Sequence, residues 1–183
     1  KLDTRFLLDL VSSGKDTVDG IRKVFEVADG AYSVVVLDNK GRVFAFRDPK
    51  GFRPLVVGRI GDNFVIASED GPIRQLGGTV LRDLVPGEVV QITGEGFRFS
   101  SMAPPQPSTC AFEYIYFARP DSTIDGYSVY EARVRLGEAL GRNHKANADV
   151  AVPVPESSIP VAIGYSKASG TPLEYALYKS LTS

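Results

Sequence analysis

The proline-rich stretch Ser101–Ser108 (SMAPPQPS) divides the sequence into two parts with different hydrophobic patterns. A residue that precedes proline avoids the helical conformation, and proline cannot donate to a β-ladder, so this stretch predicts a linker or a domain crossing. Before it, short apolar runs alternate with turn signals. After it, apolar runs alternate with helical patterns. The change predicts two architectures in one chain, an α+β part followed by an α/β part.

The part before the linker predicts three β-hairpins, because paired apolar runs are separated by turns rich in Gly, Asn and Asp. The predicted strand pairs are 31–37 with 42–47, 55–60 with 64–68, and 87–92 with 97–100. Two helices are expected ahead of them, at 4–11 and 17–28. The runs Val34–Val36 and Phe64–Ile66 do not alternate apolar with polar residues, so we expect these strands to be covered on both faces of antiparallel sheets.

The part after the linker has the order strand, helix, strand, helix, which is typical of a parallel sheet. The predicted elements are a strand at 110–118, a helix at 128–147, a strand at 149–154 and a helix at 159–169 that Gly170 closes. Too few residues remain for a complete α/β domain. We therefore expect the chain to be an internal piece of a longer protein.

Composition narrows the possible partners. The 183 residues include 21 Lys and Arg against 22 Asp and Glu, and this formal net charge of -1 argues against binding to nucleic acid or to a membrane surface. No apolar run is long enough to span a bilayer. A single cysteine, Cys110, cannot form an internal disulfide, so a reducing compartment and a cytoplasmic location are expected.

The segment Pro153–Pro160 (PVPESSIP) leaves an apolar run, passes two serines and enters a helix. The N–H groups at a helix start, with the hydroxyls of Ser157 and Ser158, form a natural site for phosphate or pyrophosphate. Open α/β sheets also bind ligands at the carboxyl ends of their strands. The structural alternative is that one of these serines only caps the helix, with Pro160 in its first turn.

The aromatic segment 112–122 (FEYIYFARPDS) predicts either a core strand or the apolar wall of a tunnel or domain interface, with Arg119 and Asp121 at its mouth. The segment 47–55 (RDPKGFRPL) predicts a structural turn whose Arg and Asp bond the backbone, and 67–71 (ASEDG) predicts a helix cap. The sequence has no HExxH, GxSxG, GxGxxG, P-loop or paired CxxC pattern. Metalloprotease, hydrolase and zinc-finger chemistry therefore lack support.

The order of these motifs resembles that of the glutamine phosphoribosylpyrophosphate amidotransferase family. The resemblance rests on DGAYSVVVL, RDPKGFRPLVVG, FVIASED, LRDLVPGEVVQI, CAFEYIYFARPDSTIDGYSVYEARVRLGEAL and DVAVPVPESSIPVAIGYSKASGTP, and these segments extend over nearly the whole chain. The RDP-G-RPL and ASE pieces are shared with other N-terminal-nucleophile amidotransferases. FEYIYFARPDS followed by PVPESS is more specific.

The resemblance implies that residues 1–104 are part of a glutaminase domain, with antiparallel sheets between helices, and that 105–183 begin a phosphoribosyltransferase domain of α/β type. Such enzymes release ammonia from glutamine with an N-terminal cysteine. They use that ammonia to displace pyrophosphate from phosphoribosyl pyrophosphate (PRPP), which yields 5-phosphoribosylamine, glutamate and pyrophosphate. This is the first step of de novo purine biosynthesis.

The resemblance also implies roles for particular residues. Asp3 is expected to hold the amino group of glutamine, for which a carboxylate is the natural partner. Glu156, Ser157 and Ser158 are expected to bind PRPP, with Ser158 close to Mg²⁺.

Phe112 and Tyr116 are expected to line a hydrophobic ammonia passage, whose dry wall keeps ammonia from bulk water. Cys110 occupies the position of one iron–sulfur ligand in a branch of the family, but no cluster is predicted, because no second cysteine is present. Purine nucleotides are expected as inhibitors and a homo-oligomer as the assembly of the longer protein.

The nucleophilic cysteine and the ribose-phosphate motif are not found in the chain, and Cys110, in mid-chain, has no free amine to act as its base. We therefore expect the chain alone to be inactive. Two alternatives stay open at this point. One is another N-terminal-nucleophile glutamine amidotransferase, and the other is a nucleotide-binding relic that has lost its chemistry.

Overall fold

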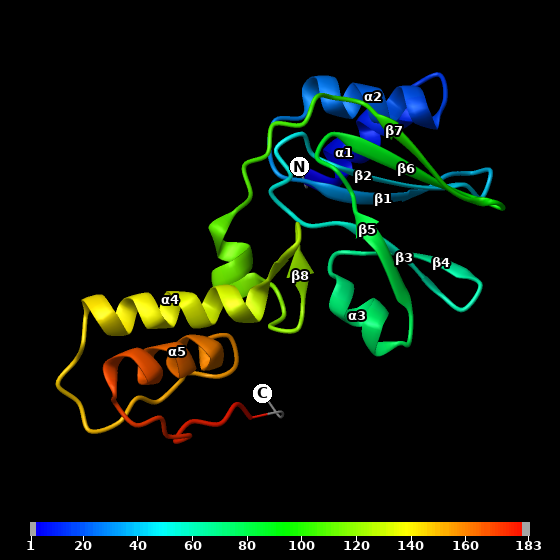
Figure 1. Ribbon diagram of the computed structural model, residues 1–183. Coiled ribbons are helices and arrows are strands. Elements are labelled where there is room, and N and C mark those ends of the chain that lie inside the picture. Colours follow the sequence, from blue (N-terminus) through cyan, green and yellow to red (C-terminus); the bar gives the residue numbers. More distant parts are fainter. Residues whose placement is uncertain (1–2, 181–183) are drawn as a thin grey trace. The chain divides into compact units, whose positions relative to one another are not determined.

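A computed structural model describes residues 3–180 of the chain, and these residues group into two units (Figure 1). The first unit comprises the residues up to 68 together with 72–109. The second comprises 69–71 and the residues from 110 onward. The predicted assignment of 1–104 and 105–183 to two enzyme domains stays a prediction.

Two helices begin the first unit, α1 (Asp3–Ser12) and α2 (Thr17–Val27), where the sequence predicted them. The Asp16 carboxylate accepts a 2.9 Å hydrogen bond from the Asp19 N–H and so caps α2. The apolar stripe of α2 places Ile21 and Val24 in the core, where both are fully buried.

The strands of the first unit form two antiparallel sheets. The four-stranded sheet has the order β1 (Ser33–Leu37), β2 (Val43–Arg47), β6 (Glu88–Thr93), β7 (Gly96–Ser101). The three-stranded sheet has the order β4 (Asn63–Ala67), β3 (Val56–Ile60), β5 (Thr79–Asp83), and the short helix α3 (Asp70–Gln75) follows β4. The predicted hairpins are confirmed as the antiparallel pairs β1–β2, β3–β4 and β6–β7.

Three layers make up the first unit. Strand alternation points Phe44 and Phe46 of β2 toward the helices α1 and α2, which lie on one face of the four-stranded sheet (Figure 1). Ala45, between them, points to the opposite face and packs with Val57 of the other sheet. The core therefore lies on both sides of β2, which is why this strand reads as a continuous apolar run.

The predicted two-sided cover of the run Val34–Val36 is wrong. Val34 and Val36 pack against the helical core, but Val35 is 56% exposed. The reason is position: β1 is an edge strand of its sheet, and its face opposite the helices is open to solvent at Val35.

The second unit contains η1 (Glu113–Phe117), a π-helical turn, the short strands β8 (Thr123–Ile124) and β9 (Tyr127–Ser128), and the helices α4 (Val129–Asn143) and α5 (Ile159–Ser169). The Ser128 hydroxyl caps α4 by accepting from the Glu131 N–H at 3.3 Å. Gly170, with a φ of 74°, ends α5 as predicted.

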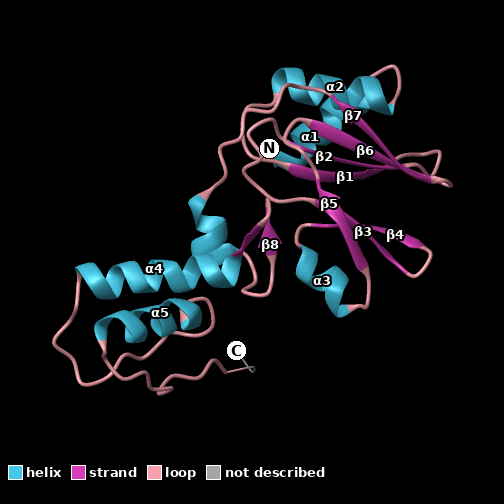
Figure 2. Ribbon diagram, viewed as in Figure 1, coloured by secondary structure: helices cyan, strands magenta, loops and turns pink. Residues whose placement is uncertain are grey.

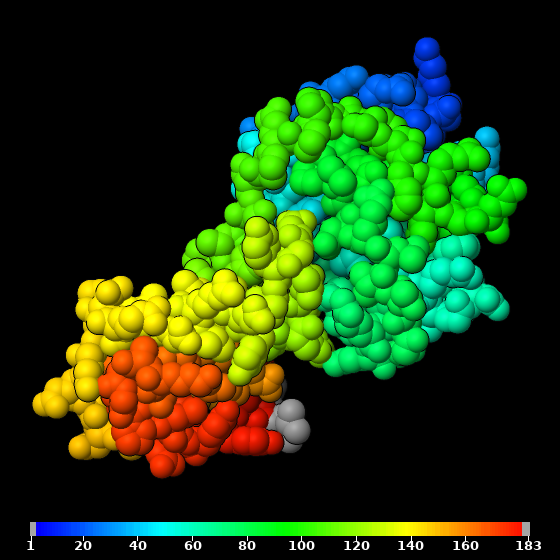
Figure 3. Space-filling view, viewed as in Figure 1, coloured from blue at the N-terminus to red at the C-terminus, as the bar shows by residue number. Residues whose placement is uncertain are grey.

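The helices α4 and α5 lie side by side (Figure 2), and in the space-filling view their side chains are in direct contact (Figure 3). Glycines allow this close approach. A Cβ atom at Gly137 of α4 would collide with the Val161 carbonyl oxygen, and one at Gly164 of α5 would collide with the Val134 carbonyl oxygen.

The predicted strand at 110–118 is wrong, because this segment forms η1 instead. A short aromatic run does not distinguish a strand from a helical turn by periodicity alone. In the structure, the carbonyl oxygens of Tyr114 and Ala118 accept hydrogen bonds from the Arg133 guanidinium, so the segment needs no neighbouring strand.

Two further predictions in this unit need correction. The strand expected at 149–154 is absent from the described residues, and only Ala151 forms a parallel bridge, with Leu173. Pro153 and Pro155 lack the N–H groups that a ladder requires, so the pairing does not extend. The helix expected to reach 147 ends at Asn143, and the Ala146 N–H donates to the Tyr165 hydroxyl of α5 at 2.8 Å instead of continuing the helix.

Within residues 3–180, no helix combines the length and the apolar character needed to cross a membrane.

Candidate functional site

The loop before α5 holds the predicted phosphate-binding residues. Ser158 occupies the N-cap position of α5, but its side chain makes no capping hydrogen bond to the described part of the helix. The Ser158 hydroxyl instead donates to the Val154 carbonyl oxygen, which folds the loop back on itself. Ser157 and Ser158 are half-buried and Glu156 is exposed. The simple capping alternative therefore does not account for Ser158.

The chemistry of this loop suits an anion. The start of α5 carries the positive end of the helix dipole, although Pro160 has no N–H and the Ile159 N–H donates to the Glu156 carbonyl oxygen at 3.3 Å. Serine hydroxyls and the Glu156 carboxylate supply oxygen atoms close to the same helix start. Oxygen donors of this kind, together with phosphate oxygens, are the ligands that Mg²⁺ prefers.

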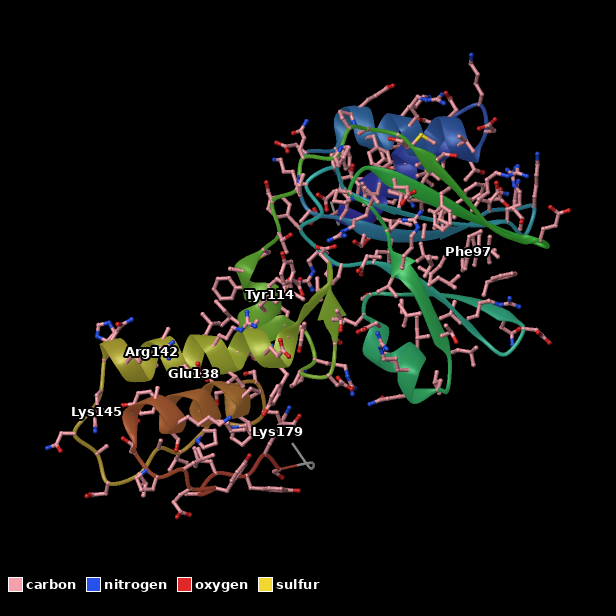
Figure 4. All side chains as sticks on the ribbon, in the orientation of Figure 1. Phe97, Tyr114, Glu138, Arg142, Lys145 and Lys179 are labelled. Carbon is pink, nitrogen blue, oxygen red and sulfur yellow. The ribbon has the colours of Figure 1, made fainter. Side chains whose placement is uncertain are left out.

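The aromatic segment presents its rings to the surface. Phe112 is 59% exposed and Tyr116 is 62% exposed, and both rings contact Phe117, with centroid distances of 6.2 Å and 5.7 Å. Tyr114 points inward, and its hydroxyl donates to the Ile124 carbonyl oxygen at 3.0 Å (Figure 4). Glu113 is buried. One side of η1 is thus fixed in the core while the other offers an apolar aromatic surface.

Arg133 of α4 fixes the inner side of η1. It is fully buried, and it donates from Nε to the Tyr114 carbonyl oxygen at 2.6 Å and from Nη2 to the Ala118 carbonyl oxygen at 2.8 Å. Burial lowers the pKa of the Arg133 guanidinium, and the negative charge of Glu69 opposes that shift. No sequence pattern indicates this role, because an arginine in a helical pattern is most often a solvated residue.

The segment 69–71 holds the turn that follows η1. One oxygen of Glu69, Oε2, accepts from the Arg119 N–H at 2.8 Å and from the Ser122 hydroxyl at 2.6 Å. Asp70 is buried and its Oδ1 accepts from the Thr123 N–H at 2.9 Å. The sequence predicted 67–71 as a helix cap and missed these long-range contacts, since no local pattern reports a partner fifty positions away.

Arg119 and Asp121, the predicted mouth of the aromatic segment, form a bidentate ion pair. Both hydrogen bonds measure 2.9 Å, and both side chains are about half exposed. The Arg119 guanidinium lowers the pKa of the Asp121 carboxyl, and Asp121 raises the pKa of Arg119, to which the charges of Glu69 and Glu156 add.

The structure confirms the bonding predicted for the turn 47–55. Arg47 is buried and donates to the carbonyl oxygens of Gly51, Arg53 and Leu84. The Asp48 carboxylate accepts from the N–H of Tyr32 and of Lys50. This turn is a structural element of the first unit.

Asp3, the predicted glutamine-binding residue, is exposed in the first turn of α1. It belongs to the first unit, whereas Phe112, Tyr116 and the loop 156–158 belong to the second. Cys110 is half-buried just before η1. Among residues 3–180, no group of three His, Cys, Asp or Glu side chains gathers as a metal site would require.

Comparison with known proteins identifies the chain's relatives. Residues 1–75 match a glutamine amidotransferase domain family. The chain is 47% identical over 161 residues to the amidophosphoribosyltransferase of Methanothermobacter thermautotrophicus, which covers 87% of this chain and 34% of that protein. It is 42% identical over 183 residues to the Bacillus subtilis amidophosphoribosyltransferase, covering 97% of this chain and 38% of the relative.

Two solved structures superpose on the chain with a TM-score of 0.90 at 38% identity. One is the Bacillus subtilis glutamine PRPP amidotransferase complexed with ADP and GMP, which covers 100% of this chain and 40% of that one. The other is described as the allosteric regulatory enzyme of purine biosynthesis and covers 99% of this chain. The chain thus spans a little over a third of the length of these relatives, and the predicted resemblance to amidophosphoribosyltransferases is confirmed.

Proposed function

We propose that this chain is part of an amidophosphoribosyltransferase of purine biosynthesis. In this reaction, glutamine is hydrolysed to glutamate and ammonia. The ammonia nitrogen forms a bond to C1 of the PRPP ribose, and the bond from C1 to pyrophosphate breaks. The products are 5-phosphoribosylamine, glutamate and pyrophosphate.

One observation carries the proposal: the superposition with a TM-score of 0.90 extends over the entire chain, both units included. A shared glutaminase fold alone would account only for the first unit. The agreement in the second unit, with η1, α4 and α5, favours a PRPP amidotransferase over other N-terminal-nucleophile amidotransferases.

The proposed roles follow the chemistry of each residue. The Asp3 carboxylate holds the α-ammonium group of glutamine by a charge-assisted hydrogen bond. The positive end of the α5 dipole, with the hydroxyls of Ser157 and Ser158, binds the pyrophosphate of PRPP. Glu156 lies in the same loop, where it orients the sugar-phosphate substrate through hydrogen bonds to its hydroxyls.

Mg²⁺ is the metal that this site fits. The loop offers one carboxylate and two hydroxyls, too few for a protein cage but enough for an ion that also binds substrate phosphates, which is the usual arrangement for Mg²⁺. When bound, Mg²⁺ would supply positive charge to the pyrophosphate oxygens, and Ser158 with Glu156 and Ser157 would hold it. An iron–sulfur cluster needs four ligands, usually cysteines, and Cys110 is the single cysteine of this chain, so we do not propose one.

Phe112 and Tyr116 are proposed to line the path that ammonia takes. Their exposed rings, packed against Phe117, form an apolar surface, and an apolar wall favours neutral ammonia over ammonium.

Purine nucleotides are proposed as inhibitors. The Bacillus subtilis relative was solved with ADP and GMP, and a feedback-regulated first step is consistent with that complex. A homo-oligomeric assembly and a cytoplasmic location remain part of the proposal.

The test is an assay of the protein encoded by the complete gene with glutamine, PRPP and Mg²⁺, in which both glutamate and pyrophosphate are measured. We expect both to be released. Asp3→Asn should raise the KM for glutamine about tenfold and leave ammonia-dependent pyrophosphate release intact, since one charged hydrogen bond is lost. Ser158→Ala should weaken PRPP-dependent turnover with either nitrogen source.

Other results would point elsewhere. Glutamate release without any pyrophosphate release would indicate a different amidotransferase. Nucleotide binding without turnover would indicate a binding protein.

A further inference from the structure

A single peptide group, between Ala118 and Arg119, is held from both of its polar ends. Its carbonyl oxygen accepts a 2.8 Å hydrogen bond from Nη2 of Arg133, and its N–H donates a 2.8 Å hydrogen bond to Oε2 of Glu69. A cation on α4 and an anion in the segment 69–71 thus hold one peptide plane, which follows directly after η1.

Arg133 and Glu69 each make further contacts in the second unit. Arg133 is fully buried and also bonds the Tyr114 carbonyl oxygen at 2.6 Å, while its Nη1 has no hydrogen-bond partner within residues 3–180. Glu69 also accepts from the buried Ser122 hydroxyl. An arginine that is removed from water requires compensating charge, and Glu69 supplies negative charge that acts on it.

The aromatic rings of the segment 112–117 lie largely at the surface of the described residues. Phe112, Tyr116 and Phe117 are more than half exposed, so their position depends on the backbone that carries them. That backbone is fixed at Tyr114 and at Ala118–Arg119 by Arg133 and Glu69. The placement of these exposed rings therefore depends on hydrogen bonds that Arg133 and Glu69 make with the backbone.

We propose that Glu69 and Arg133 are positioning residues that set the place of the aromatic rings of 112–117, and that this placement determines how much glutamine-derived ammonia reaches PRPP. The second half of this inference rests on the proposed function. The first half is independent of it. Neither residue touches the reacting atoms in this assignment.

The first experiment measures hydrogen exchange of the segment 112–119 in the complete protein. Glu69→Gln and Arg133→Met should each accelerate exchange there by about fivefold or more. A roughly fivefold effect is the smallest that a typical coupling between two sites produces. The matched controls are Glu131→Gln and Arg135→Met, which remove the same groups from an exposed ion pair on α4. Unchanged exchange in both Glu69→Gln and Arg133→Met would overturn the positioning role, whatever the enzyme catalyses.

The second experiment separates three rates: glutamate release, pyrophosphate release driven by added ammonia, and pyrophosphate release driven by glutamine. In Glu69→Gln the first two should stay within about twofold of wild type. The glutamine-driven rate should fall about fivefold or more, so that glutamate is released without matching product. Arg133→Lys, which keeps the charge but not the forked geometry, should lie between wild type and Arg133→Met.

The outcomes distinguish this inference from the proposed function. If the wild-type protein releases no pyrophosphate with either nitrogen source, the proposed function fails, and hydrogen exchange still decides the positioning role. If wild type is active and all three rates fall together in Glu69→Gln, the residue only supports the fold and the inference is overturned. If Glu69→Gln adds nothing to Arg133→Met in the double variant, the two residues act through the same peptide group.

Discussion

Asp38 organises the turn between β1 and β2 through hydrogen bonds that converge on its carboxylate. It accepts from the N–H groups of Lys40 and Arg42, from the Arg42 guanidinium at 2.8 Å and from the Thr17 hydroxyl at 2.9 Å. Burial raises the pKa of this carboxyl, but the hydrogen bonds from Arg42, Thr17 and Lys40 outweigh burial and hold the pKa well below its usual range. One side chain thereby ties a hairpin turn to the first residue of α2.

Protonation of Asp38 should therefore cost stability in acid. Because the folded-state pKa lies below the ordinary value of 3.8, the stabilisation is complete above about pH 4 and is lost as the pH falls below it. Asp38→Asn should lower the unfolding temperature at pH 7 and flatten its dependence on pH between about 2 and 4. Asp62→Asn, at an exposed position, is the control for the charge change. Equal acid dependence in wild type and Asp38→Asn would contradict this account.

Tyr32 is a buried titratable residue of the first unit. Its hydroxyl is buried and has no hydrogen-bond partner within the described chain, and burial, with the charge of Asp48, raises its pKa to about 12. Tyr32→Phe should leave the free energy of unfolding unchanged or raise it by up to about 1 kcal/mol, because a buried polar atom without a partner is removed. Wild type should also lose stability from about pH 10 upward, since the unfolded tyrosine ionises first, and Tyr32→Phe should lack that loss.

The control is Tyr114→Phe. That hydroxyl does have a partner, the Ile124 carbonyl oxygen, so its removal should lower the free energy of unfolding by about 1 kcal/mol. Urea unfolding measures the free energy of unfolding of both variants. A larger decrease in Tyr32→Phe than in Tyr114→Phe would contradict the assignment of the Tyr32 hydroxyl as a buried group without a partner.

At the scale of elements, the pair α4–α5 is held together by contact rather than by charge. The ion pair Glu138–Arg142 lies along α4 itself (Figure 4) and does not join the helices. Gly137 is buried against the backbone of α5, and Gly164 against the backbone of α4. These two positions let the helices approach more closely than any other residue would allow.

Gly137→Ala should therefore lower the free energy of unfolding by about 3 kcal/mol, at the upper end for overpacking, despite the higher helix propensity of alanine. Gly94→Ala is the comparison, because a Cβ there meets open space and the φ is not in the left-handed region. Urea unfolding followed by circular dichroism measures both. A higher free energy of unfolding in Gly137→Ala than in wild type would contradict this prediction, because it would mean that α4 and α5 can move apart without losing stability.

The helices and hairpins were predictable because their signals are local. Asp16 before α2, Gly170 after α5 and the turns between paired apolar runs all act within a few residues. The form of η1 was not predictable, because it depends on Arg133, fifteen positions beyond Ala118. The roles of Glu69 and Gly137 likewise depend on partners that no local pattern reveals. The strand wrongly predicted at 149–154 is a different case, because Pro153 and Pro155, which limit the pairing, are visible in the sequence. Of the predicted site, the loop before α5 could be located from its sequence, but the residues that fix the aromatic segment could not.

The proline-rich stretch is part of the first unit rather than a free linker. The N–H groups of Gln106 and Ser108 donate to the carbonyl oxygens of Pro49 and Lys50, each at 2.7 Å. The turn 47–55 thereby holds the stretch that the sequence predicted as a crossing. The first unit accordingly extends to Thr109.

Two shortened proteins would test this boundary. A chain ending at Thr109 keeps both hydrogen bonds, and one ending at Pro104 loses them. We expect the longer one to have a free energy of unfolding higher by about 2 kcal/mol, at about 1 kcal/mol per hydrogen bond. Thermal unfolding of the pair is the measurement, and identical midpoints would place the boundary at Pro104.

The glycine contacts of α4 also limit how this protein can vary over time. The obstacle that a methyl group at Gly137 meets is a main-chain oxygen, which every amino acid carries. No exchange of the side chain at Val161 could make room, so a change at Gly137 has no second-site remedy on the facing helix. A homologue with another residue at this position must therefore have α5 displaced as a whole, or must lack the close packing of α4 against α5.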